Sequence, residues 1–199
     1  YVNNATIRNL KTTGTITTGG MNAAGIVGEV AGSLNLSSCN SSVSISSSRP
    51  QMDAHGGLVA SNNGNVTISG CVFDGSFAAT VAHNNLYGTT FCGGIVGMCV
   101  ENTSTTITNS LVAPSSVAEG MVSKTFVGLD DNATVTIENC YFVATANLPT
   151  NQGTQVYYTA PANEISKSIT ISGTTVYFDA CSVSGVESFY EYTGSVIQI

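Results

Sequence analysis

The sequence of 199 residues has few charged side chains and very few basic ones. Charged residues make up 9% of the chain, against about 25% in an ordinary globular protein. Five scattered basic residues, opposed by 12 acidic ones, give a formal net charge of -7. So few cations cannot neutralise a phosphate backbone, which excludes nucleic acid as a partner. Neutral groups supply the polarity instead, with 24 Ser, 25 Thr and 18 Asn.

A long apolar run, a helical periodicity and a recognisable start are also missing. No apolar run approaches the roughly 20 residues that span a bilayer as a helix, so we expect no membrane insertion. No stretch repeats its apolar residues with the period of about 3.6 that marks an amphipathic helix. The chain opens at Tyr1 without an initiator Met or a signal peptide. We therefore expect a segment of a longer, multidomain protein.

Two short elements alternate along the chain instead. The first is an apolar step framed by glycines, which starts at residues 25, 57, 94 and, in an altered copy, 125, that is 32, 37 and 31 residues apart. The second is a strand-like pentapeptide that ends in Cys or a substitute. Its copies start at residues 6, 35, 67, 106, 136 and, less clearly, 170. The alternation indicates a structural repeat.

The repeat predicts an all-β fold, a right-handed parallel β-helix of about five to six coils over residues 1–184. Apolar residues alternate with Ser, Thr and Asn within each unit, which is the periodicity of a strand. About 30 residues accommodate three strands with their turns, and such units bury a core by stacking on one another. A β-sandwich is the alternative, but it gives no reason for one pentapeptide to recur.

Stacked coils place equivalent residues above one another. We therefore expect a single inward-facing column along the axis. Its members are Ile7, Leu36, Ile68, Ile107 and Ile137. We expect Gly94 and Gly97 of the framed step at corners with positive φ, which other side chains disfavour. Ala60, at the position of Gly97 in its own unit, favours close packing as the alternative reason for glycine.

The alternation of Gly-Gly-Ile-Val-Gly steps with Thr-Ile-Glu-Asn-Cys pentapeptides resembles the GLUG-type repeats of bacterial surface proteins. The similarity covers roughly residues 5–145. The resemblance implies a surface-exposed, non-catalytic stalk or ligand-presenting module of an adhesin-like protein, and it names no ligand. Residues 186–196, with a Tyr-Thr-Gly turn, are similar to the opening strand of bacterial Ig-like modules. We therefore expect residues 185–199 to be a tail that leads towards such a module.

Three of the six cysteines share one register position, which other copies of the pentapeptide fill with Leu, Ser or Thr. These are Cys39, Cys71 and Cys140. We expect small, inward-facing packing sites with free thiols there. Cys92 and Cys99 flank the third framed step, and a disulfide between them stays an open alternative.

Histidine is represented only by His55 and His83. Neither lies at ligand spacing from a cysteine pair, so we expect no metal site and no cofactor. A Cys92 nucleophile with one of these histidines as its base is the sharpest catalytic alternative. A Cys92 that packs at a corner is the simpler interpretation.

A β-helix that cleaves polysaccharide is the main enzymatic alternative, and it would need two convergent carboxylates. The candidates are Asp74, Glu101, Asp130, Asp131 and Glu138. Asp130 and Asp131, followed by Asn132, are the only cluster, and such a run is typical of a turn, with weak calcium binding as the other interpretation. We expect no enzymatic activity.

The longest insertion within the repeat, between Phe77 and Phe91, is the candidate ligand-binding surface. It carries polar and aromatic side chains that can stack on, and hydrogen-bond to, a sugar or a protein. These are His83, Asn84, Asn85 and Tyr87. A solvated loop that covers the coil is the alternative, as it is for a second polar loop at residues 49–55. The sequence therefore predicts a monomeric, adhesin-like module on the bacterial cell surface, with a host or plant glycan or another surface protein as its partner.

Overall fold

The computed structural model describes residues 1–48, 54–80, 90–159, 167–171 and 174–178. The chain forms two compact units, Tyr1–Gln155 and Val156–Ile199. All regular elements of the described residues are β-strands. In the first unit they pair in parallel throughout, which is the arrangement of a β-solenoid.

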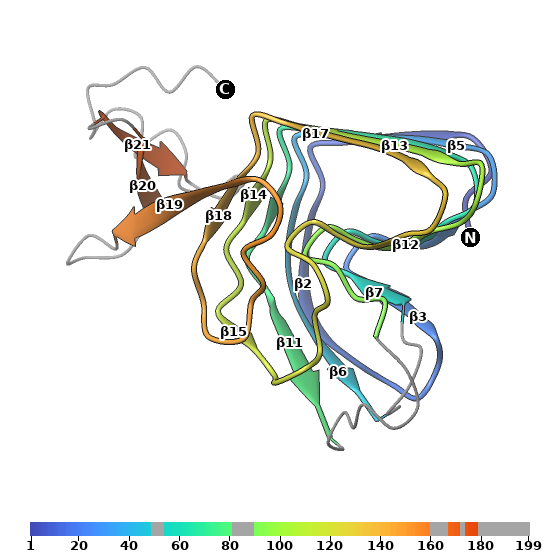
Figure 1. Ribbon diagram of the computed structural model, residues 1–199, viewed down its shortest axis with the longest axis horizontal. Helices are drawn as coiled ribbons and strands as arrows, with labels where there is room; N and C mark the ends of the chain where they lie inside the picture. Colours follow the sequence, from blue (N-terminus) through green and yellow to red (C-terminus); the bar gives the residue numbers. More distant parts are fainter. Residues whose placement is uncertain (49–53, 81–89, 160–166, 172–173, 179–199) are drawn as a thin grey trace. The chain divides into compact units, whose positions relative to one another are not determined.

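Three faces of the solenoid enclose its core (Figure 1). The first sheet stacks five strands, β1 (Ala5–Arg8), β5 (Ser33–Ser37), β9 (Asn65–Ser69), β13 (Ser104–Thr108) and β17 (Thr134–Glu138). The second sheet contains β2 (Lys11–Thr18), β6 (Asn40–Ser47), β10 (Val72–Phe73), β11 (Ser76–Ala79), β14 (Leu111–Val112), β15 (Ser116–Val117) and β18 (Tyr141–Val143). The third sheet stacks β4 (Val27–Val30), β8 (Val59–Asn62), β12 (Val96–Cys99) and β16 (Val127–Asp130), and beside it β3 (Asn22–Ala24) pairs with β7 (Ala54–Gly56).

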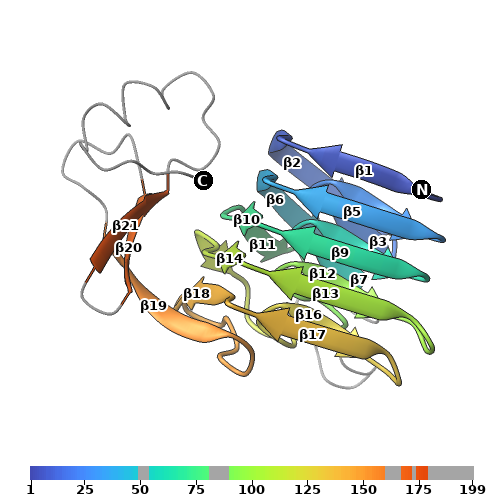
Figure 2. The same cartoon turned by 90° about the horizontal axis from the view of Figure 1, so that it is seen from above.

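The chain visits the three sheets in the same order in every turn. Followed from β1 to β17, it winds as a right-handed solenoid (Figures 1 and 2), the usual hand for parallel crossovers. Five stacked strands in the first sheet correspond to about four turns, fewer than the five to six coils that the sequence predicts. The first unit ends at Gln155, whereas the predicted repeat domain continues to residue 184. The predicted tail, 185–199, lies outside the described residues.

The sixth copy of the pentapeptide accounts for the difference in turn number. Its first residues lie in β20 (Lys167–Ile171), which pairs with β19 (Thr154–Thr159) and β21 (Thr174–Phe178). Both pairings are antiparallel. A strand in an antiparallel hairpin does not add a turn to a parallel solenoid.

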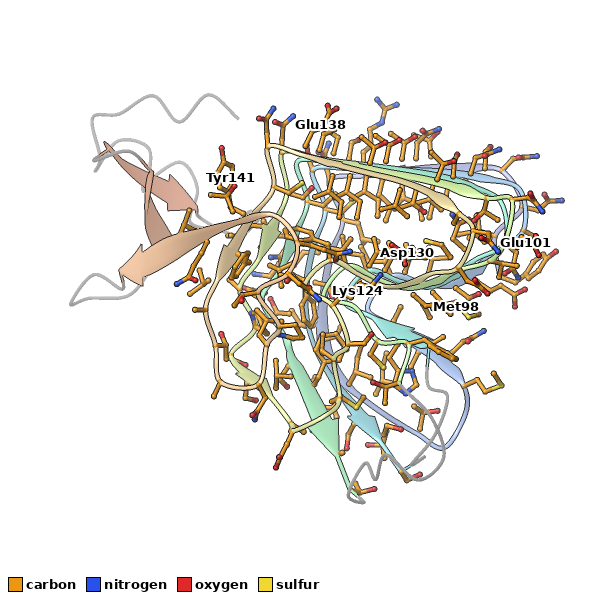
Figure 3. All side chains as sticks on the ribbon, viewed as in Figure 1. Met98, Glu101, Lys124, Asp130, Glu138 and Tyr141 are labelled. Carbon is orange, nitrogen blue, oxygen red and sulfur yellow. The ribbon has the colours of Figure 1, made fainter. Side chains whose placement is uncertain are left out.

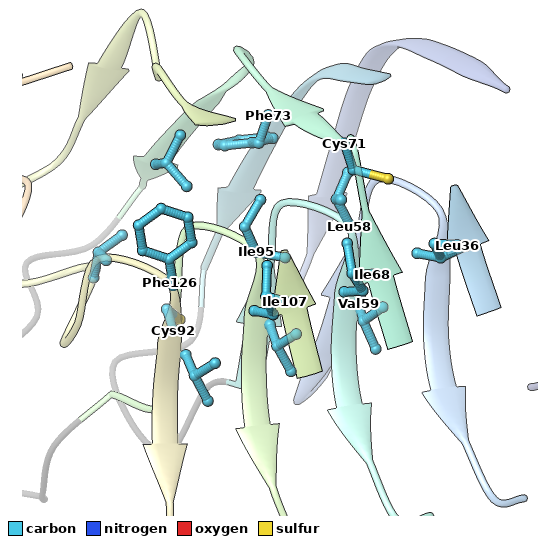
Figure 4. Packing of buried hydrophobic residues seen from close by; sticks show 14 of the residues in the cluster. Leu36, Leu58, Val59, Ile68, Cys71, Phe73, Cys92, Ile95, Ile107 and Phe126 are labelled. Atoms are coloured by element: carbon cyan, nitrogen blue, oxygen red, sulfur yellow. The ribbon is translucent and has the colours of Figure 1, made fainter. Parts of the chain in front are cut away.

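The predicted inward column is confirmed by the register of the first sheet. The aligned residues are Ile7, Leu36, Ile68, Ile107 and Ile137. The three central members are at most 1% exposed, while the first and last are partly buried at the two ends of the stack. Figure 4 shows Leu36, Ile68 and Ile107 in successive strands, facing apolar residues of the third sheet such as Val59. The stacking of turns thus buries the core.

Positive φ occurs at a corner that the sequence did not predict. The residue after each strand of the first sheet has a φ between 50° and 61°. These residues are Asn9, Ser38, Gly70, Asn109 and Asn139. Asn and Gly tolerate this left-handed conformation best, which explains why they recur just before the Cys position of the pentapeptide. The corner therefore depends on this position and not on the framed step.

The prediction of positive φ at Gly94 and Gly97 is wrong, since neither has it. Both glycines are required by close packing. A Cβ atom on Gly94 would lie 2.3 Å from the carbonyl oxygen of Thr125, and one on Gly97 would lie 2.5 Å from that of Ala60. Hydrogen is the only substituent that fits between successive turns at these positions.

Candidate functional site

The predicted ligand-binding residues His83, Asn84, Asn85 and Tyr87 lie outside the described residues. The structure describes the scaffold on both sides of them, with β11 ending at Ala79 and the chain continuing from Thr90. Residues 49–53 of the second predicted loop also lie outside the described part. His55, at the end of that loop, lies in β7 and is fully buried.

The two loops leave the solenoid from strands that lie side by side. Ala79, at the end of β11, is in register with Ser47, at the end of β6. Thr80 N then donates a hydrogen bond to Ser47 O at 2.8 Å, and Ser48 N donates to Thr18 O at 2.8 Å. The strand ends that precede the loops are therefore fixed to the backbone of neighbouring turns.

The chain returns from these loops in register as well. Gly56 follows the loop at residues 49–55, and it pairs with Gly93, which follows the insertion between Phe77 and Phe91. Gly93 in turn pairs with Lys124 in the next turn of the solenoid. We call this region, where the chain passes from the second sheet to the β3–β7 side in four successive turns, the loop corner. Its connections are residues 19–21, 48–53, 80–92 and 118–123.

The described part of the loop corner combines exposed residues, such as Met21 and Thr80, with buried ones, such as Thr90 and Met121. Thr90 Oγ1 donates to Gly120 O at 3.1 Å, which joins the connections of the third and fourth turns. Met21 is 42% exposed and is one of three large apolar side chains exposed among the described residues, with Tyr1 and Val100. Loops that emerge from a rigid scaffold are the usual carriers of binding residues.

The candidate carboxylates do not form one group. Asp74 is buried and accepts hydrogen bonds from Ser42 Oγ at 2.6 Å and from Asn40 Nδ2 at 3.4 Å. Asp130 forms an ion pair with Lys124. Figure 3 shows Glu138 far from Glu101 and Asp130. Two of the five are thus engaged in local contacts.

The remaining acidic cluster forms a turn, as the sequence predicts. Asp131 and Asn132 follow β16, and Asn132 has a φ of 48°. Asn102 N donates to Asn132 O at 3.4 Å, so Glu101 and Asp131 belong to neighbouring turns of the solenoid, and both side chains are exposed. Among the described residues, no group of three or more His, Cys, Asp and Glu side chains lies close enough to hold a metal ion.

The cysteines of the pentapeptide are buried and free, as predicted, and Cys92 and Cys99 are also free and buried. The shared register position forms a hydrogen-bonded ladder. Cys39 N donates to Cys71 Sγ at 3.4 Å, and Cys71 N donates to Ser110 Oγ at 3.1 Å. Each of these side chains also donates to a backbone carbonyl two residues earlier in the chain. The distances are 3.3 Å from Cys39 Sγ to Ser37 O, 3.4 Å from Cys71 Sγ to Ser69 O and 2.8 Å from Ser110 Oγ to Thr108 O. Ser110 is thus a working substitute for cysteine.

Burial favours the protonated form of three of the thiols. It raises the pKa of Cys71 to about 12, and burial likewise raises the pKa values of Cys99 and Cys140. The thiolate is the form that attacks substrates and binds metals. Raised pKa values therefore suit these three cysteines to packing and hydrogen bonding.

Comparison with known proteins gives no match to a protein family, to a curated protein or to a solved structure. Within the described residues, no helix has the length and apolar character needed to cross a membrane.

Proposed function

We propose that this chain is a non-catalytic, ligand-presenting module of an adhesin-like protein on the surface of a bacterial cell. The solenoid acts as a rigid stalk, and the loop corner presents the ligand-binding side chains. The observation that carries this proposal is the shared origin of the two longest insertions, which leave from Ser47 and Ala79, residues in direct register.

Regular stacking supports the role as a stalk. The outward-facing residues of the first sheet are mostly Ser, Thr and Asn, which hydrogen-bond along the stack, as in Ser104 Oγ to Asn65 Oδ1 at 2.8 Å and Ser33 Oγ to Asn4 Oδ1 at 2.9 Å. Short, uncharged polar side chains keep a long surface solvated without making it adhesive. Specific binding then falls to the loops.

The carboxylates favour this proposal over polysaccharide cleavage. A glycosidase holds one protonated and one ionised carboxyl group on opposite sides of the bond to be cleaved. Glu101 and Asp131, which lie in neighbouring turns, are both exposed to solvent. Sites for small ligands are concave and enclose most of the ligand, whereas these two side chains are exposed to water.

Binding to a glycan array and to cell-surface protein extracts tests the proposal. We expect a ligand that binds the intact chain and does not bind the variants Tyr87→Ala and Asn84→Ala. Asn35→Ala, an exposed asparagine of β5 in the first sheet, is the matched control and retains binding. A ligand whose binding none of the loop variants weakens would contradict the role of the loop corner.

A polysaccharide digestion assay distinguishes the alternative. Release of reducing ends that disappears in Glu101→Gln or Asp131→Asn would establish the enzyme and overturn the proposed function. We expect no release above that of a buffer blank from any glycan that the chain binds.

A further inference from the structure

Successive turns of the third sheet are joined by one repeated hydrogen-bond pattern. Two consecutive N–H groups of one turn converge on a single carbonyl oxygen of the next turn. The donors and acceptors are Ile26 and Val27 to Leu58 O at 3.2 and 2.9 Å, Leu58 and Val59 to Ile95 O at 3.0 and 3.0 Å, and Ile95 and Val96 to Phe126 O at 3.0 and 2.9 Å. Each turn therefore needs a carbonyl from the turn that follows it.

The last turn obtains this acceptor from a side chain. Gln152 Oε1 accepts from Phe126 N at 2.8 Å and from Val127 N at 2.9 Å, and Gln152 Nε2 donates to Val127 O at 3.4 Å. Asn151 Oδ1 accepts from Thr125 N at 3.2 Å, where Gly94 N of the previous turn donates to a backbone carbonyl. Two side-chain amides thus replace the backbone of an absent turn.

The identity of residue 125 also reflects the absence of a following turn. In earlier turns this position is glycine, because a Cβ atom would meet the carbonyl of the next turn, at 2.1 Å for Gly57 and 2.3 Å for Gly94. The last turn has no such carbonyl above it, and a threonine fits. Its Oγ1 donates to Pro149 O at 2.6 Å and accepts from Gln152 N at 3.3 Å, and the residue is fully buried.

Gly153 and Thr154, which directly follow Gln152, close the neighbouring part of the C-terminal end of the solenoid. Thr154 N donates to Cys140 O at 2.9 Å, repeating the bond from Tyr141 N to Ser110 O in the turn before. Gly153 has a φ of +74°, and a Cβ atom there would lie 2.5 Å from Cε2 of Phe126. The backbone of Gly153 therefore lies directly against the aromatic ring of Phe126.

We propose that residues 149–154 are a terminal cap, which closes the C-terminal end of the solenoid against the addition of a second copy of this chain. The first turn of a second copy is the strand partner that fits this end. Its Ile26 carbonyl has the position of the Leu58, Ile95 and Phe126 carbonyls, and Ile26 is only partly buried. Among the described residues the third sheet has no strand before β4, where Val2 forms a single parallel bridge to Val30.

The cap matters because such stacking is head to tail. An exposed row of strand N–H groups is a template for pairing with another chain. A contact between two different ends of identical molecules does not close on itself, and it grows into filaments. Side-chain amides that satisfy the last N–H groups of the third sheet remove this template there, and among the described residues no further strand of that sheet follows β16.

Amide hydrogen exchange of the intact chain and of Asn151→Ala/Gln152→Ala tests the cap directly. We expect the Phe126 and Val127 amides to exchange at least about tenfold faster in the double variant, since their acceptor is lost. Gln155→Ala, an exposed glutamine beyond the cap, is the control and leaves both rates unchanged. Gln152→Glu retains an acceptor oxygen and keeps the protection. Equal exchange of both amides in the intact chain and in the double variant would overturn the cap.

Sedimentation velocity tests what the cap excludes. We expect the double variant to form a concentration-dependent series of oligomers, while the intact chain and Gln155→Ala remain monomeric. Excess intact chain shortens the series to small oligomers. Its first turn adds to the uncapped end of the variant, and its own capped C-terminal end then stops further addition. A double variant with fast amide exchange that remains monomeric at all concentrations would overturn the exclusion of a second copy.

Discussion

Gly28 and Gly97 have the same position in the framed step of two different turns, and they provide a matched test of why glycine is needed. A Cβ atom on Gly28 would meet no heavy atom within 4 Å. The same atom on Gly97 would lie 2.5 Å from Ala60 O, 2.8 Å from Ala54 C and 2.8 Å from His55 O. Neither glycine has positive φ, so substitution by alanine tests packing alone.

The expected free energies differ in sign. Insertion of a methyl group into a filled site costs about 1–3 kcal/mol, and Gly97→Ala belongs at the upper end because all three contacts are backbone atoms. Alanine also restricts the unfolded chain, which stabilises by about 0.4–1 kcal/mol where no clash opposes it. We therefore expect Gly97→Ala to destabilise by about 2 kcal/mol and Gly28→Ala to stabilise by about 0.5 kcal/mol.

Thermal unfolding followed by circular dichroism of the β-sheet measures this difference. A separation of about 2.5 kcal/mol corresponds to about 5–10 °C between the two midpoints for a chain of this size. Equal shifts for the two variants would refute the packing argument, and loss of stability in Gly28→Ala alone would reverse it. A neutral Gly97→Ala would also refute it, because the neighbouring backbone would then have moved aside.

Three other predictions concern the corner of the first sheet. Cys71→Ser retains the melting temperature within about 2 °C, whereas Cys71→Val leaves the buried Cys39 N–H without its acceptor and costs about 1–3 kcal/mol. The raised pKa of Cys71 means that the folded state disfavours the thiolate. The contribution of Cys71 to stability is therefore full below pH 9.0 and falls as the pH rises towards about 12. Urea unfolding at pH 8 and at pH 10.5 detects this loss of stability, and the variant Cys71→Ser shows a smaller loss. Asn109, with a φ of 50°, loses about 1 kcal/mol on replacement by Ala and less on replacement by Gly, as thermal melting of both variants shows.

The architecture was predictable because a recurrent pentapeptide constrains register. When Ile68 and Ile107 have equivalent places in two units that cannot bury a core alone, stacking is the arrangement that buries both. The same argument predicted buried thiols, because a position that exchanges Cys71 with Ser110 must be small and face inward.

Details that depend on contacts between turns were not predictable from one unit. Thr105 is a clear example, since its column is otherwise apolar, with Ala5, Leu34, Val66 and Val135. Its buried hydroxyl lies 2.8 Å from Asn62 Nδ2 and 3.1 Å from Cys99 Sγ. Alternation of polar and apolar residues alone cannot show that three polar groups of different turns satisfy one another.

The loop corner was predictable from the sequence only in part. The two insertions are visible in the sequence as residues that interrupt the repeat, and their composition suggests binding. Their common origin depends on the register between Ser47 and Ala79, which no property of either loop encodes. A sequence signal was nevertheless present, because both insertions follow the same element of the repeat.

Departures from the repeat carry as much information as the repeat itself. Thr125, in place of the glycine of the framed step, marks the turn that has no successor, because a side chain fits there only where the next carbonyl is absent. The edge beyond it is already paired with Asn151 and Gln152. A sixth pentapeptide begins after this point, and its strand pairs antiparallel with β19 and β21 instead of adding a parallel strand to the first sheet. Counting pentapeptides overestimates the number of turns for this reason, whereas counting glycines that a following turn requires locates the end of the solenoid.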